Sequence, residues 1–596
     1  MRLVAYDTCQ ALLGGLRSAT AKQVGPYGLS GGSEILPDGA LPLRRSAPGA
    51  ESSAAAPQYS GTNVQETGVD EPDMVKTDGR RIVVAAQGRI WVIDAATRKV
   101  TGSLTVPRTA SGIAFRAIQG GNLLLSGDRL LIISPQPVFE PLVRERPPIT
   151  PQSGQSSQSI PYRGAQTVIT MVDLSSAPKV TGTLTVHGDY VDARQVGSVA
   201  RIVVRSSPQI RFPLPRGGKA TSDTATMTEA NRQAVATAPL SDWLPSYEIS
   251  APGGAAQTRQ VPCDQVSHPA NASAGSLLSV MTVDLAKGLG DPSPISVTAD
   301  GSKVYGTGSS LYVAGVAWTG GPTYQPDQAP RTDIHKFDIS GSGRPRYVAS
   351  GDVPGTLLNQ YSMSEYAGNL RLATTTANQS SVYVLAPTGT RLDQVGGVGG
   401  LGRGEQIRAV RFLGPTGYVV TFRQTDPLYT VNLADPRHPA VTGELKLKGY
   451  SAYLHPTTQG RLLGVGQDAT TAGRVTGAQV QLFDVSSGAP RRVGGVDLPG
   501  AYTQVEYDPH AFLYWPQSGL TVVPMTGLTS EVLVLSVGPD GIKRLGTVQQ
   551  PKVNGYADQI QRSVLIGGSL WTISNSGARA SDAATLASQS WVPFRS

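Results

Sequence analysis

The chain is poor in several residue types, and each shortage excludes a class of protein. Two cysteines in 596 residues are too few for a framework of several disulfides. The six histidines include no pair spaced as H-x-x-x-H and the two cysteines lie far apart, so the spacing typical of a zinc site is missing. Aromatic residues make up 6% of the chain and charged residues 16%.

Long apolar runs and long charged runs are also missing. No stretch of 18 apolar residues occurs, so we predict no membrane-spanning helix. Met1 leads directly into polar Asp7 and Thr8, and the chain as given shows no signal peptide. The net charge of +8 is dilute, with no run of five like charges, so we expect no nucleic-acid partner.

Glycine and proline are abundant, at 69 and 44 residues, which is typical of short strands joined by tight turns. One pattern returns along the chain: a strand ending in an acidic or amide residue, a polar turn, then V-x-G followed by alternating apolar residues. Copies include DAATRKVTGSLTVP from Asp94 and DVSSGAPRRVGGVDLPG from Asp484. Such repetition indicates a fold built from one repeated β unit.

Paired strand signals recur every 45 to 60 residues from residue 59 onward, among them 81–94, 122–134, 303–315, 369–386, 417–434, 461–486, 511–525 and 563–574. We interpret each pair as the two middle strands of a four-stranded blade. Blades have two apolar faces and are stable when neighbours cover both. The sequence therefore predicts an all-β fold, a single large β-propeller of about eight blades within a range of seven to nine.

The first 58 residues differ from the rest. Residues 3–24 place apolar side chains at helical spacing after Asp7 or Thr8 as N-cap, which predicts a short helix. Residues 26–58 are rich in Gly, Pro, Ser and Ala and are expected to be a linker or extended segment. The propeller is assigned to 59–596, with long insertions at 135–165 and at 206–275, the second containing a short helix near 222–238 and splitting one blade.

The stretch from Tyr59, YSGTNVQETGVDEPDMVKTDGRRI, together with IHKFDI at 334–339, resembles a secreted bacterial and archaeal β-propeller family distantly related to WD40 repeats. The similarity extends through most of the chain. It implies a protein in the cell envelope or outside the cell. It supplies no catalytic residues.

Five carboxylates within this motif form the densest polar cluster of the sequence. Asp70, Glu71 and Asp73 are candidate ligands of calcium, which prefers oxygen donors, although the order of a calcium loop is missing. The alternative is that the carboxylates cap turns and pair with arginine or Lys76, which would fix this segment to the ring. No other cofactor is expected.

Four further residues are weak candidates for binding. Trp318 and Tyr324 flank a Gly/Pro-rich loop and could stack on a sugar or a peptide. His455 and His510 occupy the inner-strand position of successive blades and could face the central channel, or could serve buried polar groups. Cys9 and Cys263 are either free thiols or one long-range disulfide, which would imply an oxidising compartment.

Gly397–Gly402 spells G-x-G-x-x-G but precedes a strand rather than a helix, so we expect a flexible connection between blades instead of a phosphate loop.

The leading hypothesis is a noncatalytic binding or scaffold module at the cell envelope, presenting propeller loops to a protein or polysaccharide. The alternative is a propeller enzyme, a hydrolase or quinone-dependent dehydrogenase, with its site in the central channel, since DAATRKVTG at 94–102 resembles a turn of quinoprotein blades. Whether the protein is an enzyme stays open, with the noncatalytic role expected.

Overall fold

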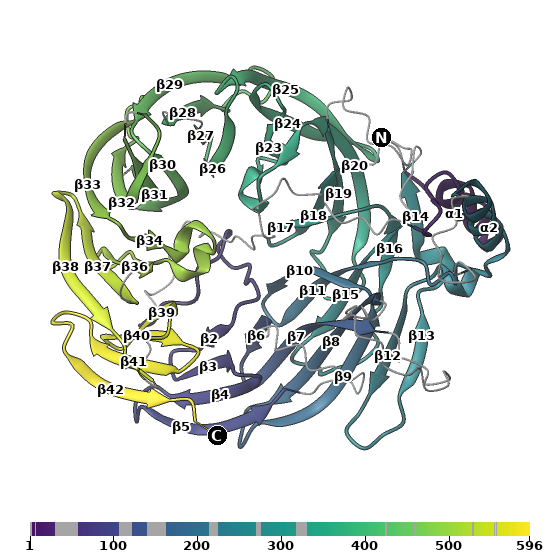
Figure 1. The fold of residues 1–596 in the computed structure, drawn as a ribbon, viewed down its shortest axis with the longest axis horizontal. Helices are drawn as coiled ribbons and strands as arrows, with labels where there is room; N and C mark the ends of the chain where they lie inside the picture. The colour runs from purple at the N-terminus through teal and green to yellow at the C-terminus, as the bar shows by residue number, and fades with distance from the viewer. Residues whose placement is uncertain are drawn as a thin grey trace, which may run out of the picture.

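The computed structural model describes residues 3–5, 8–29, 58–106, 122–139, 162–213, 224–269, 276–316, 330–422, 426–457, 460–470, 472–526, 530–553, 555 and 557–595. Small antiparallel sheets stand around one axis and form a closed ring, as Figure 1 shows. The predicted all-β propeller is therefore confirmed.

Among the first three blades, blade 3 carries the insertion predicted at 206–275. Blade 1 contains β2 (Val75–Thr77), β3 (Arg81–Ala86), β4 (Arg89–Asp94) and β5 (Lys99–Thr105). Blade 2 contains β6 (Asn122–Ser126), β7 (Arg129–Phe139), β8 (Tyr162–Asp173) and β9 (Lys179–His187). Blade 3 contains β10 (Asp189–Val196), β11 (Val199–Ser206), β15 (Leu277–Asp284) and β16 (Ile295–Thr298). Since β11 pairs with β15, the insertion between them splits blade 3 as predicted.

The next three blades are more regular. Blade 4 contains β17 (Lys303–Gly306), β18 (Ser310–Val316), β19 (Arg331–Asp338) and β20 (Arg346–Pro354). Blade 5 contains β21 (Thr356–Leu357), η3 (Gln360–Ser362), β22 (Met363–Tyr366), β23 (Asn369–Thr375), β24 (Ser380–Thr388) and β25 (Arg391–Leu401). Blade 6 contains β26 (Gln406–Leu413), β27 (Thr416–Phe422), β28 (Asp426–Asn432) and β29 (Ala440–Leu447). One parallel bridge, Ser350 with Arg391, also links the outer strands of blades 4 and 5.

The last three blades complete the ring. Blade 7 contains β30 (Tyr450–Thr457), β31 (Arg461–Ala469), β32 (Val475–Asp484) and β33 (Arg491–Pro499). Blade 8 contains β34 (Tyr502–Thr503), η4 (Gln504–Glu506), η5 (Pro509–Ala511), β35 (Leu513–Trp515), β36 (Leu520–Thr526), β37 (Glu531–Gly538) and β38 (Gly541–Gln549). Blade 9 contains β39 (Ile560–Ile566), β40 (Ser569–Ser574), β41 (Gly577–Asp582) and β42 (Ser588–Pro593).

The described residues thus form nine blades, one more than the expected eight and within the predicted range. Each boundary between neighbouring blades holds its own cluster of buried apolar side chains. At the closure, Trp571 of blade 9 packs with Ile82 and Trp91 of blade 1, and Trp91 stacks on Phe594 with ring centroids 5.3 Å apart. Burial of apolar area between blades therefore stabilises the ring all the way round.

The repeated acidic residue ends the third strand of a blade and caps the turn that follows. Asp94 Oδ1 accepts a hydrogen bond of 2.7 Å from Thr97 N, and Asp582 Oδ1 accepts one of 2.8 Å from Thr585 N. These carboxylates replace backbone acceptors that a tight turn lacks, so the recurring Asp or Asn has a structural role.

The repeated glycine lies on the outer strand, where the next blade comes close. A Cβ placed on Gly443 of β29 would lie 2.9 Å from Pro490 Cδ in blade 7, and one on Gly102 would collide with Pro178 of blade 2. The missing side chain therefore makes room for the neighbouring blade's turn, which explains why V-x-G repeats with the blades.

Two interpretations of the strand pattern are corrected. The pairs at 122–134, 303–315, 511–525 and 563–574 are the first and second strands of their blades, because the inner strands there are as apolar as the middle ones. Gly397–Gly400 belong to the outer strand β25 and not to a flexible connection.

A small satellite packs on the outside of blades 2 and 3 (Figure 1). It contains α1 (Cys9–Ala21), capped by Thr8, and α2 (Thr224–Thr237), which confirms both predicted helices. Neither helix in the described part of the chain is long and apolar enough to cross a membrane. Strand β1 (Leu3–Ala5) pairs with β14 (Val266–Pro269) at the edge of blade 3, while β12 (Ser246–Ser250) and β13 (Gln257–Gln260) extend blade 2. Two single turns, η1 (Leu240–Asp242) and η2 (Cys263–Gln265), complete the described part of the insertion.

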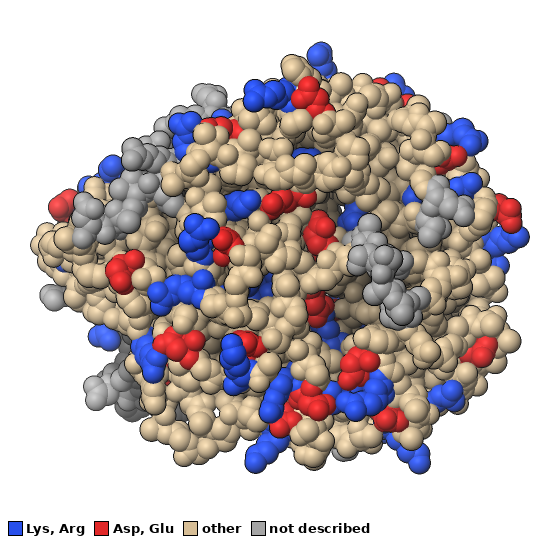
Figure 2. Space-filling view, turned by 180° about the vertical axis from the view of Figure 1, so that it is seen from behind, with Lys and Arg blue, Asp and Glu red and all other residues tan. Residues whose placement is uncertain are grey.

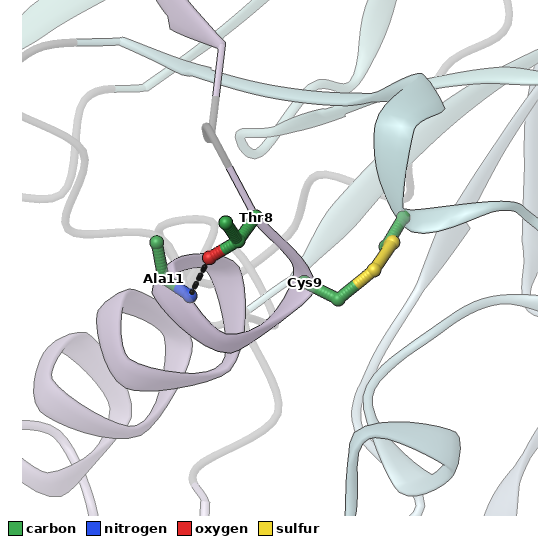
Figure 3. Close-up of a disulfide and its surroundings, with 4 residues drawn as sticks. Thr8, Cys9 and Ala11 are labelled. Carbon is green, nitrogen blue, oxygen red and sulfur yellow. Dashed lines mark hydrogen bonds between the residues drawn. A yellow bond between two sulfur atoms is a disulfide. The ribbon is translucent and has the colours of Figure 1, made fainter.

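A disulfide joins Cys9 of α1 to Cys263 of η2, with their Cα atoms 5.5 Å apart (Figure 3). The bond closes a loop across 254 residues of sequence. Of the two alternatives left open by the sequence, the structure has the long-range disulfide.

Candidate functional site

The candidate site lies in the middle of the ring, which the chain's own residues 59–74 cross from blade 9 to blades 3 and 2 (Figure 1). We call these residues the plug segment. It begins beside blade 9, where Ser60 N donates to Leu565 O over 2.8 Å. It ends beside blade 2, where Asp73 and Leu123 exchange backbone hydrogen bonds of 3.2 and 2.8 Å.

Local sequence explains why this segment forms no regular strand of its own. Gly68 has φ +79 and Pro72 lacks an N–H, so neither residue supports a continuous ladder. Gly79, just beyond the segment, has φ +82 and lies against the ring of Tyr59, so a Cβ there would collide with that ring. The GTNVQETGVDEPDMVKTDG motif therefore encodes an irregular, closely packed path.

Uncharged side chains of the plug segment bind the inner ends of several blades. Asn63 Nδ2 donates to Tyr453 Oη at 3.0 Å in blade 7 and to Pro509 O at 2.8 Å in blade 8. Gln65 Nε2 donates to two backbone carbonyls of blade 5, Gln360 O at 3.2 Å and Met363 O at 3.0 Å. The segment thus connects the inner ends of blades 5, 7 and 8.

Glu71 lies near the C-terminal end of the plug segment and is 2% exposed. Gln360 Nε2 lies 3.1 and 3.0 Å from its two carboxylate oxygens, and Gln65 N donates to it over 3.1 Å. Arg194 Nε is 3.8 Å away and His510 Nε2 is 3.5 Å away. A buried carboxylate is retained when donors and cations surround it in this way.

Asp73 forms the second buried ion pair of the segment. Arg562 Nε lies 2.7 and 3.0 Å from its two oxygens, and the same guanidinium reaches Asp508 at 2.6 Å. Asp508 Oδ1 is in turn 3.3 Å from His510 Nδ1. Carboxylates and cations therefore alternate from Asp73 through blade 9 and blade 8 to Glu71.

The electrostatics of His510 follow from this alternation. Burial disfavours its charged form, but Asp73, Asp508 and Glu71 outweigh burial and raise the pKa of His510 to about 9. Burial likewise opposes ionisation of Asp508, yet Arg562 and His510 hold the pKa of that carboxyl well below its usual range. At neutral pH His510 and Asp508 are therefore both charged, and each stabilises the charge of the other.

Asp70 is paired separately. Lys76 Nζ lies 2.6 Å from Asp70 Oδ1 and also donates to Glu71 O over 2.5 Å. The predicted alternative for these carboxylates, pairing with Lys76 and arginine to fix the segment to the ring, is therefore what the structure has.

The same geometry does not fit the calcium candidate. Asp70, Glu71 and Asp73 point to different cations, Lys76, Arg194 and Arg562, whereas calcium needs several oxygens around one point. Among the described residues, no three His, Cys, Asp or Glu side chains gather as a metal site would require.

The two histidine candidates have different surroundings. His510 belongs to the charged network, whereas His455 lies between the rings of Phe512 and Tyr514, at centroid distances of 4.8 and 5.0 Å. Burial, helped by Arg411, lowers the pKa of His455 well below its ordinary value. His455 is therefore neutral and packs as an aromatic ring, with Nδ1 3.0 Å from Tyr453 Oη.

The other aromatic candidates, Trp318 and Tyr324, lie outside the described residues. Sequence reasoning missed Arg194, Gln360 and Arg562, which complete the network. Each stands alone in its strand or turn without a motif, and the one available signal was a polar residue on the inner strand of a blade.

These contacts define a nine-bladed propeller whose centre is occupied by its own plug segment. Residues 59–586 match the family described as beta propeller domain, and the chain belongs to that family. The matched range begins at the first residue of the plug segment.

Two curated relatives carry the name uncharacterized protein. The one from Archaeoglobus fulgidus is 28% identical over 541 residues, which cover 78% of this chain and 75% of the relative. The one from Methanocaldococcus jannaschii is 39% identical over 175 residues, which cover 28% of this chain and 27% of the relative.

Solved structures resemble the fold at low sequence identity. A eukaryotic initiation factor is 10% identical with a TM-score of 0.36, covering 84% of this chain and 91% of that one. Apo AztD from Citrobacter koseri is 9% identical with a TM-score of 0.32, covering 86% of this chain and 94% of that one. The WD40 domain of Toxoplasma gondii coronin is 10% identical with a TM-score of 0.31, covering 49% of this chain and 70% of that one.

Proposed function

We propose that this protein is a noncatalytic binding or scaffold module outside the cytoplasm, which presents the turns of a rigid propeller to a partner. The observation that carries the proposal is the plug segment. It occupies the place where a ligand would meet several blades at once. Three of its four carboxylates are already paired with Lys76, Arg194 and Arg562. The surfaces left for a partner are the two rims and the outer strands.

This arrangement favours the binding module over an enzyme with its site in the channel. A catalytic acid or base must reach the substrate, whereas Glu71 and Asp73 are each 2% exposed and face cations of the ring. The charged groups at the centre serve to hold the blades in place.

One observation supports a location in the cell envelope or outside the cell. The Cys9–Cys263 disulfide is the kind of bond that persists in oxidising compartments. On the face shown in Figure 2, basic and acidic side chains are interspersed, which supports a protein or polysaccharide partner over nucleic acid.

Capture from envelope fractions of the producing cells tests the proposal. The full-length oxidised protein would be immobilised, bound material identified, and each purified candidate titrated against fresh protein. We expect one partner to bind saturably and the urea-unfolded protein to lose that binding. Absence of any saturable partner, or turnover of a bound polysaccharide, would contradict the noncatalytic assignment.

A quinone test addresses the alternative directly. We expect no spectral change when pyrroloquinoline quinone and calcium are added to the folded protein. A shift that saturates at one equivalent would favour the quinone-dependent enzyme.

A further inference from the structure

A groove of about 500 Å³ lies between blades 8 and 9, on the side of the ring that carries the β35–β36, β39–β40 and β41–β42 turns. Trp515, Leu520 and Leu565 form its buried apolar lining. Leu545 of the outer strand β38 forms one wall and is 48% exposed. Its volume is in the range of sites that hold a large side chain or a small ligand.

The β39–β40 turn contributes only backbone to the lining of the groove. Gly567 and Gly568 join β39 to β40 with φ +52 and φ +78, and a Cβ on either residue would meet nothing within 4 Å. Backbone with positive φ favours glycine at both positions, so no side chain of this turn takes part in the groove.

The chemistry of the lining specifies the occupant. The polar residues that line the groove, Gln517, Ser518 and Ser536 among them, carry amides and hydroxyls, and none of the lining residues is charged. These groups suit the N–H and C=O groups of a peptide main chain. An apolar group with an uncharged backbone fits this lining better than an ion does.

One cation stands beside the groove. Lys543 pairs with Ser536 across β37 and β38, so both side chains lie on the face of blade 8 that is turned to blade 9. Lys543 is exposed. An occupant with a carboxylate next to its apolar group would therefore be complementary to this edge.

We propose that this groove binds a large apolar side chain from a polypeptide segment of a partner protein, with an acidic residue beside it facing Lys543. The inference rests on the proposed binding function and narrows the partner from protein or polysaccharide to protein. Sugar rings stack on exposed aromatic faces, whereas Trp515 is 9% exposed and offers little such surface.

The probe is a phage-displayed library of random linear peptides, selected on the full-length oxidised protein. Selected peptides are then titrated against the wild type and against Ala584→Trp, which places a bulky ring in the groove from the β41–β42 turn. Ala587→Trp is the matched control, because Ala587 lies in the same turn, is exposed and does not line the groove. Equal melting temperatures of the two variants show that both are folded.

We expect the selected peptides to share one Leu, Phe or Trp with a neighbouring Asp or Glu. Ala584→Trp should weaken their binding by roughly tenfold or more, as loss of a buried anchor does, whereas Ala587→Trp should leave it unchanged. Lys543→Glu should weaken binding to a smaller extent, and this effect should shrink at high salt.

Three results would overturn the inference. If the selected peptides bind Ala584→Trp and the wild type with equal affinity, they occupy another surface. That result would refute the groove as the binding site but not the proposed binding module. If the envelope experiment finds a polysaccharide as the saturable partner and no peptide is selected, the inference of a protein partner is refuted. The proposed binding function is not. Failure of both experiments removes the inference and the proposed function together.

Discussion

Arg562 in blade 9 holds Asp73 of the plug segment, 489 residues earlier in the chain, with guanidinium contacts of 2.7 and 3.0 Å. In the described part of the chain, blade 9 consists of the consecutive strands β39–β42, and no described strand from the N-terminal part pairs with them. The Arg562–Asp73 pair and the apolar cluster at the closure therefore connect the two ends of the ring.

Asp73→Ala is expected to destabilise the protein by about 3–5 kcal/mol, because it leaves the buried Arg562 cation with part of its charge uncompensated. Urea unfolding followed by tryptophan fluorescence measures the change. Asp435→Ala is the control, since its pair with His438 is exposed on both sides and its removal should change the stability little. Equal effects of the two substitutions would refute the role of Asp73.

The network also predicts a pH dependence. The pKa of His510 is raised from its ordinary 6.5 to about 9, so the folded state binds the proton more tightly than the unfolded state. The stability this contributes is complete below pH 6.5 and is lost as pH rises toward 9, in total on the order of 3 kcal/mol. Unfolding titrations of the wild type and His510→Gln between pH 6.5 and 9 measure it. We expect the variant's profile to be flatter, and parallel profiles would contradict this.

Gly443→Ala tests the packing between outer strands and neighbouring turns. The added methyl group would lie 2.9 Å from Pro490 Cδ, so we expect a loss of about 1–3 kcal/mol from overpacking. Gly308→Ala, where nothing lies within 4 Å of the added carbon, should change stability little. A neutral Gly443→Ala in thermal unfolding would show that the V-x-G glycine is not required by packing.

Removal of the disulfide by Cys9→Ser with Cys263→Ser should loosen the satellite and lower stability by about 2–4 kcal/mol. Reducing agent should bring the wild type to the same melting temperature and leave the variant unaffected. Limited proteolysis should then cut first in the satellite, because its apolar cluster is separate from those between blades. Identical digestion patterns with and without the disulfide would contradict a stabilising role of the bond in the satellite.

Calcium removal should have no effect. Because Asp70, Glu71 and Asp73 face Lys76, Arg194 and Arg562, we expect EGTA to leave the melting temperature unchanged. A lower melting temperature in EGTA that is restored by added calcium would show that another set of oxygens binds the ion.

Local patterns explain how much of the fold could be predicted. An Asp at a strand end and a glycine on the following strand act through contacts within a few residues or with the next repeat, so they recur in the sequence as they recur in space. A polar N-cap at Asp7 or Thr8 and the apolar spacing after it predicted α1 for the same reason, and Thr8 is the cap. The exact number of blades was harder to predict. Inner strands such as β6 and β39 are as apolar as the middle strands, so the sequence does not show which two strands of a blade form each pair.

The centre of the molecule could not be predicted in this way. The sequence determined the repeated β unit, the propeller class and the cluster of carboxylates from Glu66 to Asp78. Tertiary structure alone decided that Glu71 meets Arg194 and Gln360, that Asp73 meets Arg562, and that Cys9 meets Cys263. The physical reason is that these partners are brought together by closure of the ring and by packing of the satellite, and no spacing along the chain records either event.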